Sequence, residues 1–228
     1  LEDPIDLPII TMATDTLILL SGKQDCDRDI KDFLRINDYG IGMFRQNNLQ
    51  AARSAFEQVV NINPKYADGF VNLSRILIKE GKFSAAEQVL GKAIQIKNGF
   101  PKANYFLSLI RKKQGKYKEA VRLFEAVRLE FPNDRILLKE LGQTYYFLEH
   151  FDLALTTFHN ALLIDPEDYQ VHYNLMLIHK KMGNQEKARD HQNHYLKYKP
   201  DEAARAVSQV TRLKFPNANN EAQLVHHH

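Results

Sequence analysis

A spacing of 34 residues recurs along most of this chain, and it limits the possible folds more than any other feature of the sequence. Alanine returns at that spacing at Ala52, Ala86, Ala120, Ala154 and Ala188. Four residues later stand Phe56, Leu90, Phe124, Phe158 and Gln192, and twelve residues later stand Pro64, Asn98, Pro132, Pro166 and Pro200. Self-similarity at a fixed period of this length indicates a stack of repeated supersecondary units.

Each unit has the pattern of two antiparallel helices joined by a short turn. Twelve residues before the alanines stand Gly40, Ser74, Ser108, Gly142 and Met176, and the breaks fall near Asn47, Gly81, Gly115 and Gly183. Small side chains let two helix backbones approach closely, and the residue four positions after the alanine lies on the same helix face. Proline then ends the second helix. The pattern predicts an all-α solenoid, because one hairpin cannot bury its apolar face alone.

These positions resemble the tetratricopeptide repeat, whose pattern is W-x2-L-G-x2-Y, then A-x3-F, then P over 34 residues. The resemblance covers residues 31–200 as five units, at about 33–66, 67–100, 101–134, 135–168 and 169–200. The fourth unit fits best, with Leu141, Gly142, Tyr145, Ala154, Phe158 and Pro166. The chain has no tryptophan, and the fifth unit departs most, with Met176, His179 and Gln192 at the usual Gly, Tyr and Phe positions. The resemblance implies a right-handed alpha-solenoid.

The two ends of the chain lie outside the repeats. Residues 1–30 contain two short apolar runs rich in β-branched residues, which predict an extended N-terminal segment, and Asp29 is the expected cap of the first helix. Residues 201–214 have a narrow apolar stripe, as a C-terminal capping helix needs. Residues 215–228 are rich in Asn and predict an irregular tail that ends in three histidines, either native or the remains of a tag.

Composition and motifs exclude several classes of function. The net charge of +3 is too small to indicate nucleic-acid binding, and the single cysteine, Cys26, rules out an intrachain disulfide or a C-x-x-C-H haem site. No apolar run approaches the roughly 18 residues of a membrane span. No signal peptide is visible, because no basic segment precedes an apolar core, and Leu1 indicates a processed or excised chain from which a signal peptide could have been removed. Nucleotide-binding, zinc-protease and hydrolase motifs are absent from the sequence, so we expect a non-enzymatic protein without a cofactor.

The resemblance to tetratricopeptide proteins implies a concave groove lined by the first helix of each unit. Carried onto this chain, the polar and aromatic groove positions are Asn37, Arg45, Arg75, Lys79, Tyr105, Lys112, Lys113, Lys139, Tyr146, Tyr173, Lys180 and Lys181. Basic and aromatic residues are interleaved at these positions, and acidic residues are nearly absent. We expect such a groove to bind an extended peptide or helix of acidic character. The alternative is that the lysines are solvated helix ends, where cations are favoured by the helix dipole.

Histidines gather in the fifth unit, at His172, His179, His191 and His194. His172 and His179 occupy large apolar positions of the repeat, where we expect them to pack and donate one hydrogen bond each. His191 and His194 are three residues apart and share a helix face. The sequence shows no third ligand, so we expect no metal site.

A closer resemblance is found in NDYGIGMF (37–44), YADGFVNLSR (66–75), IDPEDYQVHYNLML (164–177) and the C-terminal NANNEAQLVHHH. These stretches look like the C-terminal tetratricopeptide region of bacterial multihaem c-type cytochromes, which are exported proteins. The resemblance implies an extracytoplasmic, periplasmic or secreted, accessory to a redox system, with a c-type cytochrome as a candidate partner.

Three functional hypotheses follow. The first is an interaction scaffold that binds a protein segment in its groove. The second is the electron-transfer accessory, docking to a cytochrome or offering a histidine ligand in trans. The third is self-assembly, in which the N-terminal segment and the solenoid ends join copies into homo-oligomers or fibres.

Overall fold

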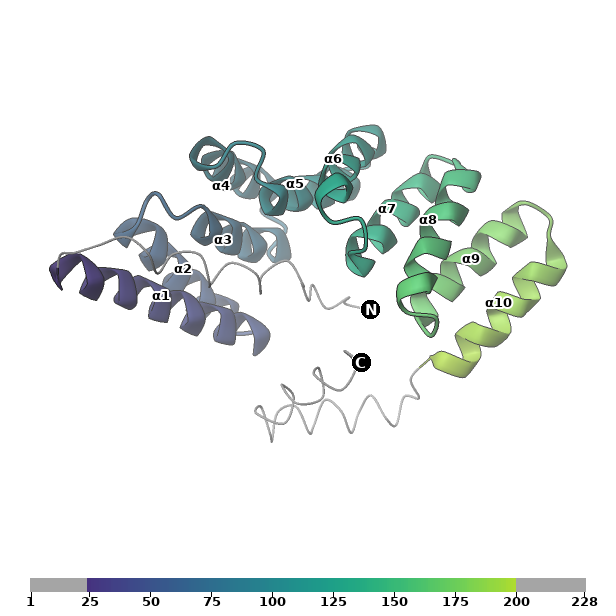
Figure 1. Cartoon of the computed structure of the whole chain (residues 1–228), viewed down its shortest axis with the longest axis horizontal. Coiled ribbons are helices and arrows are strands. Elements are labelled where there is room, and N and C mark those ends of the chain that lie inside the picture. Colours follow the sequence, from purple (N-terminus) through teal and green to yellow (C-terminus); the bar gives the residue numbers. More distant parts are fainter. Residues whose placement is uncertain (1–23, 200–228) are drawn as a thin grey trace. The chain divides into compact units, whose positions relative to one another are not determined.

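The computed structural model describes residues 24–199, with side chains from Phe33 onward, and this part of the chain is all helical (Figure 1). Its ten helices are α1 (Gln24–Arg45), α2 (Leu49–Ile62), α3 (Ala67–Lys79), α4 (Phe83–Ile96), α5 (Pro101–Lys113), α6 (Tyr117–Glu130), α7 (Arg135–Phe147), α8 (Phe151–Ile164), α9 (Tyr169–Lys181) and α10 (Gln185–Tyr198). No strand occurs in the described range. The all-α solenoid fold predicted from the 34-residue period is confirmed.

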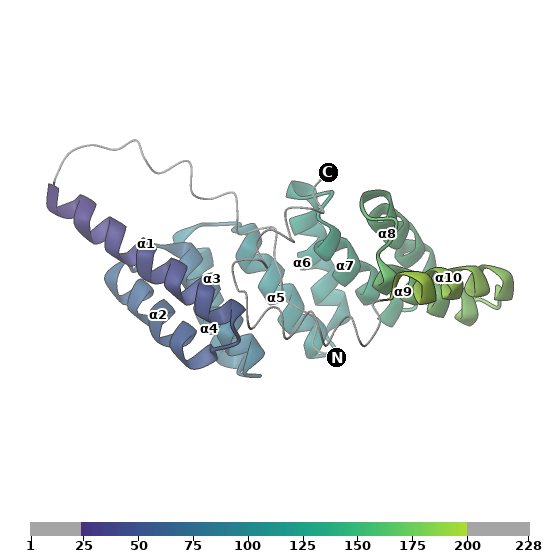
Figure 2. The same cartoon turned by 90° about the horizontal axis from the view of Figure 1, so that it is seen from below.

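The helices form two compact units that divide after Ile164. The first unit contains α1 to α8 as four hairpins, and the second contains the hairpin of α9 and α10. Within the first unit the hairpins follow one another in chain order (Figure 2). There α3 contacts both α1 and α5, and α5 contacts α7, so these four odd-numbered helices form a continuous row. We refer to them as the inner helices, and to α2, α4, α6 and α8 as the outer helices.

The repeated alanines and aromatics form the core of each hairpin in the first unit. Ala52, Ala86, Ala120 and Ala154 are fully buried, and Phe56, Leu90, Phe124 and Phe158 beside them are at most 1% exposed. A Cβ added at Gly142 would lie 2.8 Å from Phe158 Cε1, and one at Gly40 would lie 2.7 Å from Phe56 Cε1. The small residue on the first helix therefore leaves space for the ring on the second.

Serine replaces glycine in the second and third hairpins without leaving a buried hydroxyl unsatisfied. Ser74 Oγ donates to Val71 O at 2.6 Å, and Ser108 Oγ donates to Tyr105 O at 2.6 Å. Both serines are fully buried. Each hydroxyl bonds to the backbone of its own helix, as buried helical serines do, so the side chain takes little more space than an alanine.

The turn inside each hairpin contains one residue in the left-handed region. Gly81, Gly115 and Gly183 adopt φ values of 74°, 74° and 78°. In the α1–α2 and α7–α8 turns the residue is Asn47 (φ 61°) or Glu149 (φ 60°). The chain then closes each first helix through backbone bonds such as Lys82 N to Leu77 O at 2.8 Å. Glycine adopts this conformation without steric cost, whereas a residue with a Cβ, such as Glu149, adopts it at a cost in free energy.

The first helix begins earlier than the sequence predicted. Helix α1 starts at Gln24, so residues 24–30 are helical rather than extended and Asp29 is not the N-terminal cap. The sequence places Asp27 and Asp29 in the first two turns, where the positive end of the helix dipole favours acidic residues. The remaining N-terminal segment at 1–23, the expected capping helix at 201–214 and the tail at 215–228 lie outside the described residues.

Candidate functional site

The candidate site is the inner face of the first unit, where the polar residues of α1, α3, α5 and α7 were expected to line a groove. The structure divides these residues by exposure. Buried residues are Asn37, Arg75 and Tyr105, partly exposed ones are Lys112, Lys139 and Tyr146, and exposed ones are Arg45, Lys79 and Lys113. Tyr173, Lys180 and Lys181 are exposed on α9, which belongs to the second unit. The predicted set is therefore divided between two separate units.

A polar cluster joins α1 to α3 at the start of the inner row. Asn72 Nδ2 donates to Asn37 Oδ1 at 2.9 Å, and Arg75 Nη1 donates to Asn72 Oδ1 at 3.4 Å. The Arg75 guanidinium carbon lies 4.5 Å from the centroid of the Phe44 ring. Lys79 Nζ lies 5.5 Å from the same centroid. The cluster therefore places two cations against one aromatic ring, with paired amides beside them.

Asn72 was not among the predicted site residues. It is 4% exposed, and the sequence showed it only as part of an N-x-S pattern inside a helix. A polar residue on the buried face of α3, near the repeat equivalent of Asn37, was the signal that could have identified it. A buried amide needs a partner, and in α1 the polar residue within reach is Asn37.

Two lysines of the inner helices form ion pairs with carboxylates of neighbouring inner helices. Lys102 Nζ lies 2.6 Å from Asp68 Oδ1, which joins α5 to α3. Lys112 Nζ lies 2.7 Å from Glu140 Oε2 and 2.5 Å from Gln143 Oε1, which joins α5 to α7. The expectation that acidic residues are nearly absent from this face was wrong, because sequence position alone did not show how Asp68 and Glu140 reach across to the next repeat.

Tyr105 is a core residue rather than a contact residue. It is 2% exposed and packs edge-on against Phe106 and Phe124, with ring centroids 5.3 and 6.0 Å away. Burial raises the pKa of its hydroxyl well above the ordinary value. Its place between α5 and α6 removes it from the predicted groove surface.

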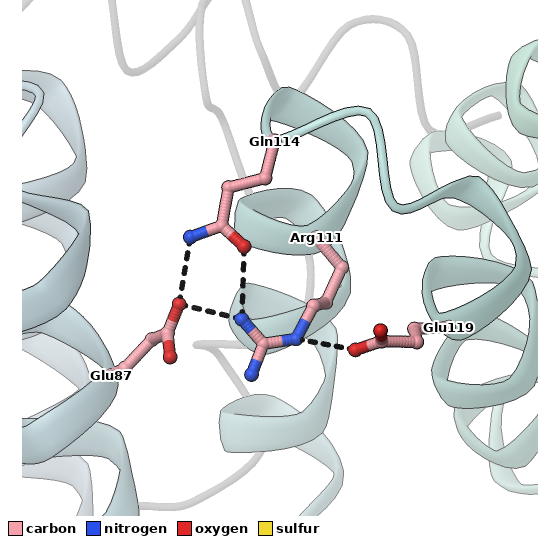
Figure 3. Close-up of polar contacts among 4 residues, drawn as sticks. All are labelled: Glu87, Arg111, Gln114 and Glu119. Atoms are coloured by element: carbon pink, nitrogen blue, oxygen red, sulfur yellow. Dashed lines mark hydrogen bonds and ion pairs between the residues drawn. The ribbon is translucent and has the colours of Figure 1, made fainter.

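A second polar network lies where α4, α5 and α6 meet (Figure 3). Arg111 Nη1 donates to Glu87 Oε1 at 2.6 Å, and Arg111 Nε lies 3.0 Å from Glu119 Oε2. Gln114 accepts from Arg111 at 3.0 Å and donates to Glu87 at 2.9 Å. The hydrogen bond from Arg111 lowers the pKa of Glu87 below its ordinary value. This network connects three consecutive helices and has a structural role.

The four histidines of the fifth unit come together between α9 and α10. His172 and His179 are buried, and His191 and His194 are half-buried. His172 Nε2 donates to Pro166 O at 2.9 Å, in agreement with the expected single donated bond. Over residues 33–199, no three His, Cys, Asp or Glu side chains converge on one point as a metal centre requires. None of the ten described helices has the length and apolar character of a membrane span.

Comparison with known proteins supports the assignment of the repeat. Residues 43–110 and 77–144 each match the family model of the tetratricopeptide repeat. The two matches overlap and together cover residues 43–144, so this part of the chain is similar to tetratricopeptide repeats. No curated protein sequence matches it significantly.

Solved structures with the same fold extend the comparison beyond the matched repeats. A mutant of MamA is 24% identical, with a TM-score of 0.60 over 76% of this chain and 99% of that one. MamA from Desulfovibrio magneticus RS-1 is 18% identical, with a TM-score of 0.64 over 73% of this chain and 94% of that one. YrrB, described as a tetratricopeptide protein with an unusual peptide-binding site, is 16% identical, with a TM-score of 0.60 over 81% of this chain and 95% of that one. At these identities the likeness concerns the fold alone.

Proposed function

We propose that the chain is a non-enzymatic scaffold that binds an extended, acidic protein segment along the inner helices of its first unit. The observation that carries the proposal is exposed Lys79, whose Nζ lies 5.5 Å from the centroid of the Phe44 ring, while the buried Arg75 guanidinium packs against the same ring. A cation held on an aromatic face keeps its charge and loses little freedom when a carboxylate binds it. The tetratricopeptide fold is itself a protein-interaction scaffold, and YrrB has a peptide-binding site by its description.

The ion pairs between the inner helices reduce the number of lysines that can contact a ligand. Lys102 and Lys112 are already neutralised by Asp68 and Glu140, so these lysines hold neighbouring repeats together. The exposed cations at the ends of the inner helices fit an acidic ligand better: Arg45 on α1, Lys79 on α3 and Lys113 on α5. Tyr146 on α7 is half-buried and adds an aromatic surface to the same row of helices. Together these residues favour carboxylates in the ligand with aromatic or aliphatic side chains between them.

The test is binding of a labelled peptide of alternating Glu and Leu, followed by fluorescence anisotropy. In Lys79→Glu/Lys113→Glu we expect binding to fall at least about tenfold, because each contact with a charged group contributes about 1.5–3 kcal/mol. The matched control is Lys118→Glu/Arg122→Glu, which makes the same charge change at exposed positions of the outer helix α6. Equal loss in both variants would show a non-specific charge effect and would contradict the inner-face site.

The partner and compartment are further parts of the proposal. The resemblance of residues 37–44, 66–75 and 164–177 to the tetratricopeptide region of multihaem cytochromes supports an extracytoplasmic accessory to a redox system, with a c-type cytochrome as partner. Purification of the chain from its source, followed by an absorption spectrum, tests this part. A haem Soret band in the co-purified fraction is expected, and its absence from stoichiometric complexes would contradict the cytochrome partner.

Self-assembly is the second candidate function, favoured by apolar side chains near the C-terminal ends of the outer helices. Leu129 on α6 and Leu163 on α8 are both 83% exposed and are separated by one repeat, and Ile62 and Ile96 occupy similar places on α2 and α4. Exposed apolar rows of this kind are typical of association surfaces. Sedimentation velocity on the chain and on Leu129→Ser/Leu163→Ser tests it, with removal of residues 1–23 as a second variant. A monomer at all concentrations would exclude this candidate.

A further inference from the structure

The hairpin of α9 and α10 in the second unit contains an imidazole cluster unlike anything in the other four hairpins. The rings of His172 and His194 stack with centroids 4.8 Å apart and an interplanar angle of 13°. The rings of His179 and His191 stack at 5.5 Å and 4°. The sequence suggested only the pair His191 and His194 as neighbours, whereas the fold adds two histidines from the facing helix.

The contact between His172 and His191 is the central feature of this cluster. Their Nδ1 atoms are 3.1 Å apart. His172 Nε2 lies 2.9 Å from the carbonyl oxygen of Pro166, which can only accept a hydrogen bond. His172 Nε2 therefore carries the ring proton in the neutral imidazole, and its Nδ1 directs a lone pair at His191. Two nitrogens so placed either share one proton or bind one cation between them.

We propose that His172 and His191 form the nucleus of a binding site for a divalent metal ion that prefers imidazole ligands, with Zn²⁺ as the first candidate. Two zinc–nitrogen bonds of about 2.0–2.1 Å at a tetrahedral angle place the nitrogens roughly 3.3 Å apart. The observed 3.1 Å between the two Nδ1 atoms is close to this value. Imidazole nitrogens suit zinc, copper and nickel, whereas Mg²⁺ and Ca²⁺ prefer oxygen ligands.

The surroundings of the pair have two further properties of a metal site. The bond from His172 Nε2 to Pro166 O is the outer hydrogen bond that metal-ligating histidines usually make, since it fixes the tautomer and the ring orientation. His172 is 5% exposed and His191 is half-buried, so one of the two ligands lies in the core of the hairpin and the other reaches its surface.

His194 is the candidate third ligand. It follows His191 by three positions on α10, and its ring already stacks on His172. Its Nδ1 now lies 3.1 Å from Asp190 O and 3.8 Å from Asp190 Oδ2. The three rings do not converge without movement, so binding requires a side-chain rotation of His194, and water completes the tetrahedral shell. The proposal is independent of the peptide-binding face, which belongs to the first unit.

The experiment is a calorimetric titration of the full-length chain with ZnCl₂ at about pH 7.5. The background carries His226→Ala, His227→Ala and His228→Ala, because three terminal histidines bind metals themselves. We expect one Zn²⁺ per chain, no binding of Mg²⁺, and weaker Zn²⁺ binding at about pH 5.5, because protons compete for the imidazoles. His191→Gln should abolish binding, and His194→Gln should weaken it about tenfold or more.

The matched control is His150→Gln/His159→Gln, which removes two exposed histidines from the first unit and should leave binding unchanged. The half-buried His191 is the main test position, since its replacement disturbs the packing less than that of buried His172. Circular dichroism checks that each variant remains helical. Absence of zinc binding in the tail-substituted chain, or equal binding by the folded His191→Gln variant, would overturn the proposal. Histidine-dependent pH effects without metal binding would overturn it too, because the pair would then hold only a proton.

Discussion

The fourth and fifth hairpins have the same helix–turn–helix structure, but the residues that pack between their helices differ. In the fourth, α8 buries Ala154, Thr157, Phe158 and Ala161 against α7, and Phe158 fills the space left by Gly142. In the fifth, Ala188 is the one buried residue within α10, and Met176 stands where Gly142 does in the repeat. Between α9 and α10, stacked imidazole rings occupy the contact that the Phe158 ring fills in the fourth hairpin.

This difference teaches that the repeat length and the core chemistry are separate requirements. A turn with one left-handed residue and two helices of 13 and 14 residues occurs in both hairpins. The apolar core of the first unit stabilises that shape by burial alone. The histidines between α9 and α10, which we call the histidine seam, stabilise it through ring contacts and hydrogen bonds, and imidazole nitrogens are groups that bind protons or metal ions. We therefore expect Zn²⁺ to raise the stability of the second unit and not that of the first.

The largest expected change in stability comes from the apolar core of the fourth hairpin. Phe158→Ala removes a fully buried ring from the fourth hairpin and should lower the free energy of unfolding by about 3–5 kcal/mol. Gln192→Ala, at the equivalent position of the fifth hairpin, should change it by less than about 0.5 kcal/mol, because Gln192 is exposed. Urea denaturation followed by circular dichroism measures both. Equal losses would show that the two hairpins depend on this position alike.

A Cβ added to a glycine should have opposite effects at two sites in the first unit. Gly142→Ala places a methyl group 2.8 Å from the Phe158 ring and should destabilise by about 1–3 kcal/mol. Gly91→Ala in α4 meets nothing within 4 Å and should stabilise by about 0.5–1 kcal/mol, because alanine restricts the unfolded chain and favours helix. Thermal unfolding of both variants measures the contrast. If Gly142→Ala were neutral, close approach would not be the reason for glycine there.

Sequence was sufficient for the parts of the molecule set by periodicity. Ala120 and Phe124 lie in the core because a 34-residue pattern fixes which helix face is buried. The sequence did not predict the ion-pair partners of long side chains that can reach more than one neighbouring helix. Lys112 and Glu140 are 28 residues apart and their ion pair depends on how two hairpins stack. Asn72 and His172 needed the facing helix before their partners could be named, since a single helix shows only its own neighbours.

The turn residues should have a smaller effect on the free energy of unfolding. At this position the fifth hairpin has the more favourable residue, although the fourth hairpin has the larger apolar core. The fifth hairpin has Gly183 in its left-handed turn position, whereas the better-packed fourth has Glu149 at φ 60°. Glu149→Gly should raise the free energy of unfolding by about 1 kcal/mol, because an L-residue costs about 1–2 kcal/mol in this conformation. Asn47→Gly should give a smaller gain, since asparagine tolerates the left-handed region. Thermal denaturation distinguishes them, and a loss of stability in Glu149→Gly would contradict the strain argument.

The smallest expected effect is the dependence of stability on acidic pH. It comes from the carboxylates around Arg111 in the first unit and not from the histidines of the second. The hydrogen bond from Arg111 lowers the pKa of Glu87 below the ordinary 4.5. A lowered pKa in the folded state stabilises the protein above pH 4.5, and this contribution is lost as the pH falls through the folded pKa. Glu87→Gln should therefore cost about 0.5–1 kcal/mol at about pH 7, as partly exposed ion pairs do, and progressively less as the pH falls below 4.5. Glu57→Gln, an exposed carboxylate of α2, is the matched control. A cost for Glu87→Gln that stays the same in acid and at neutral pH would mean that the carboxylate charge does not stabilise the first unit, and that packing of the side chain does.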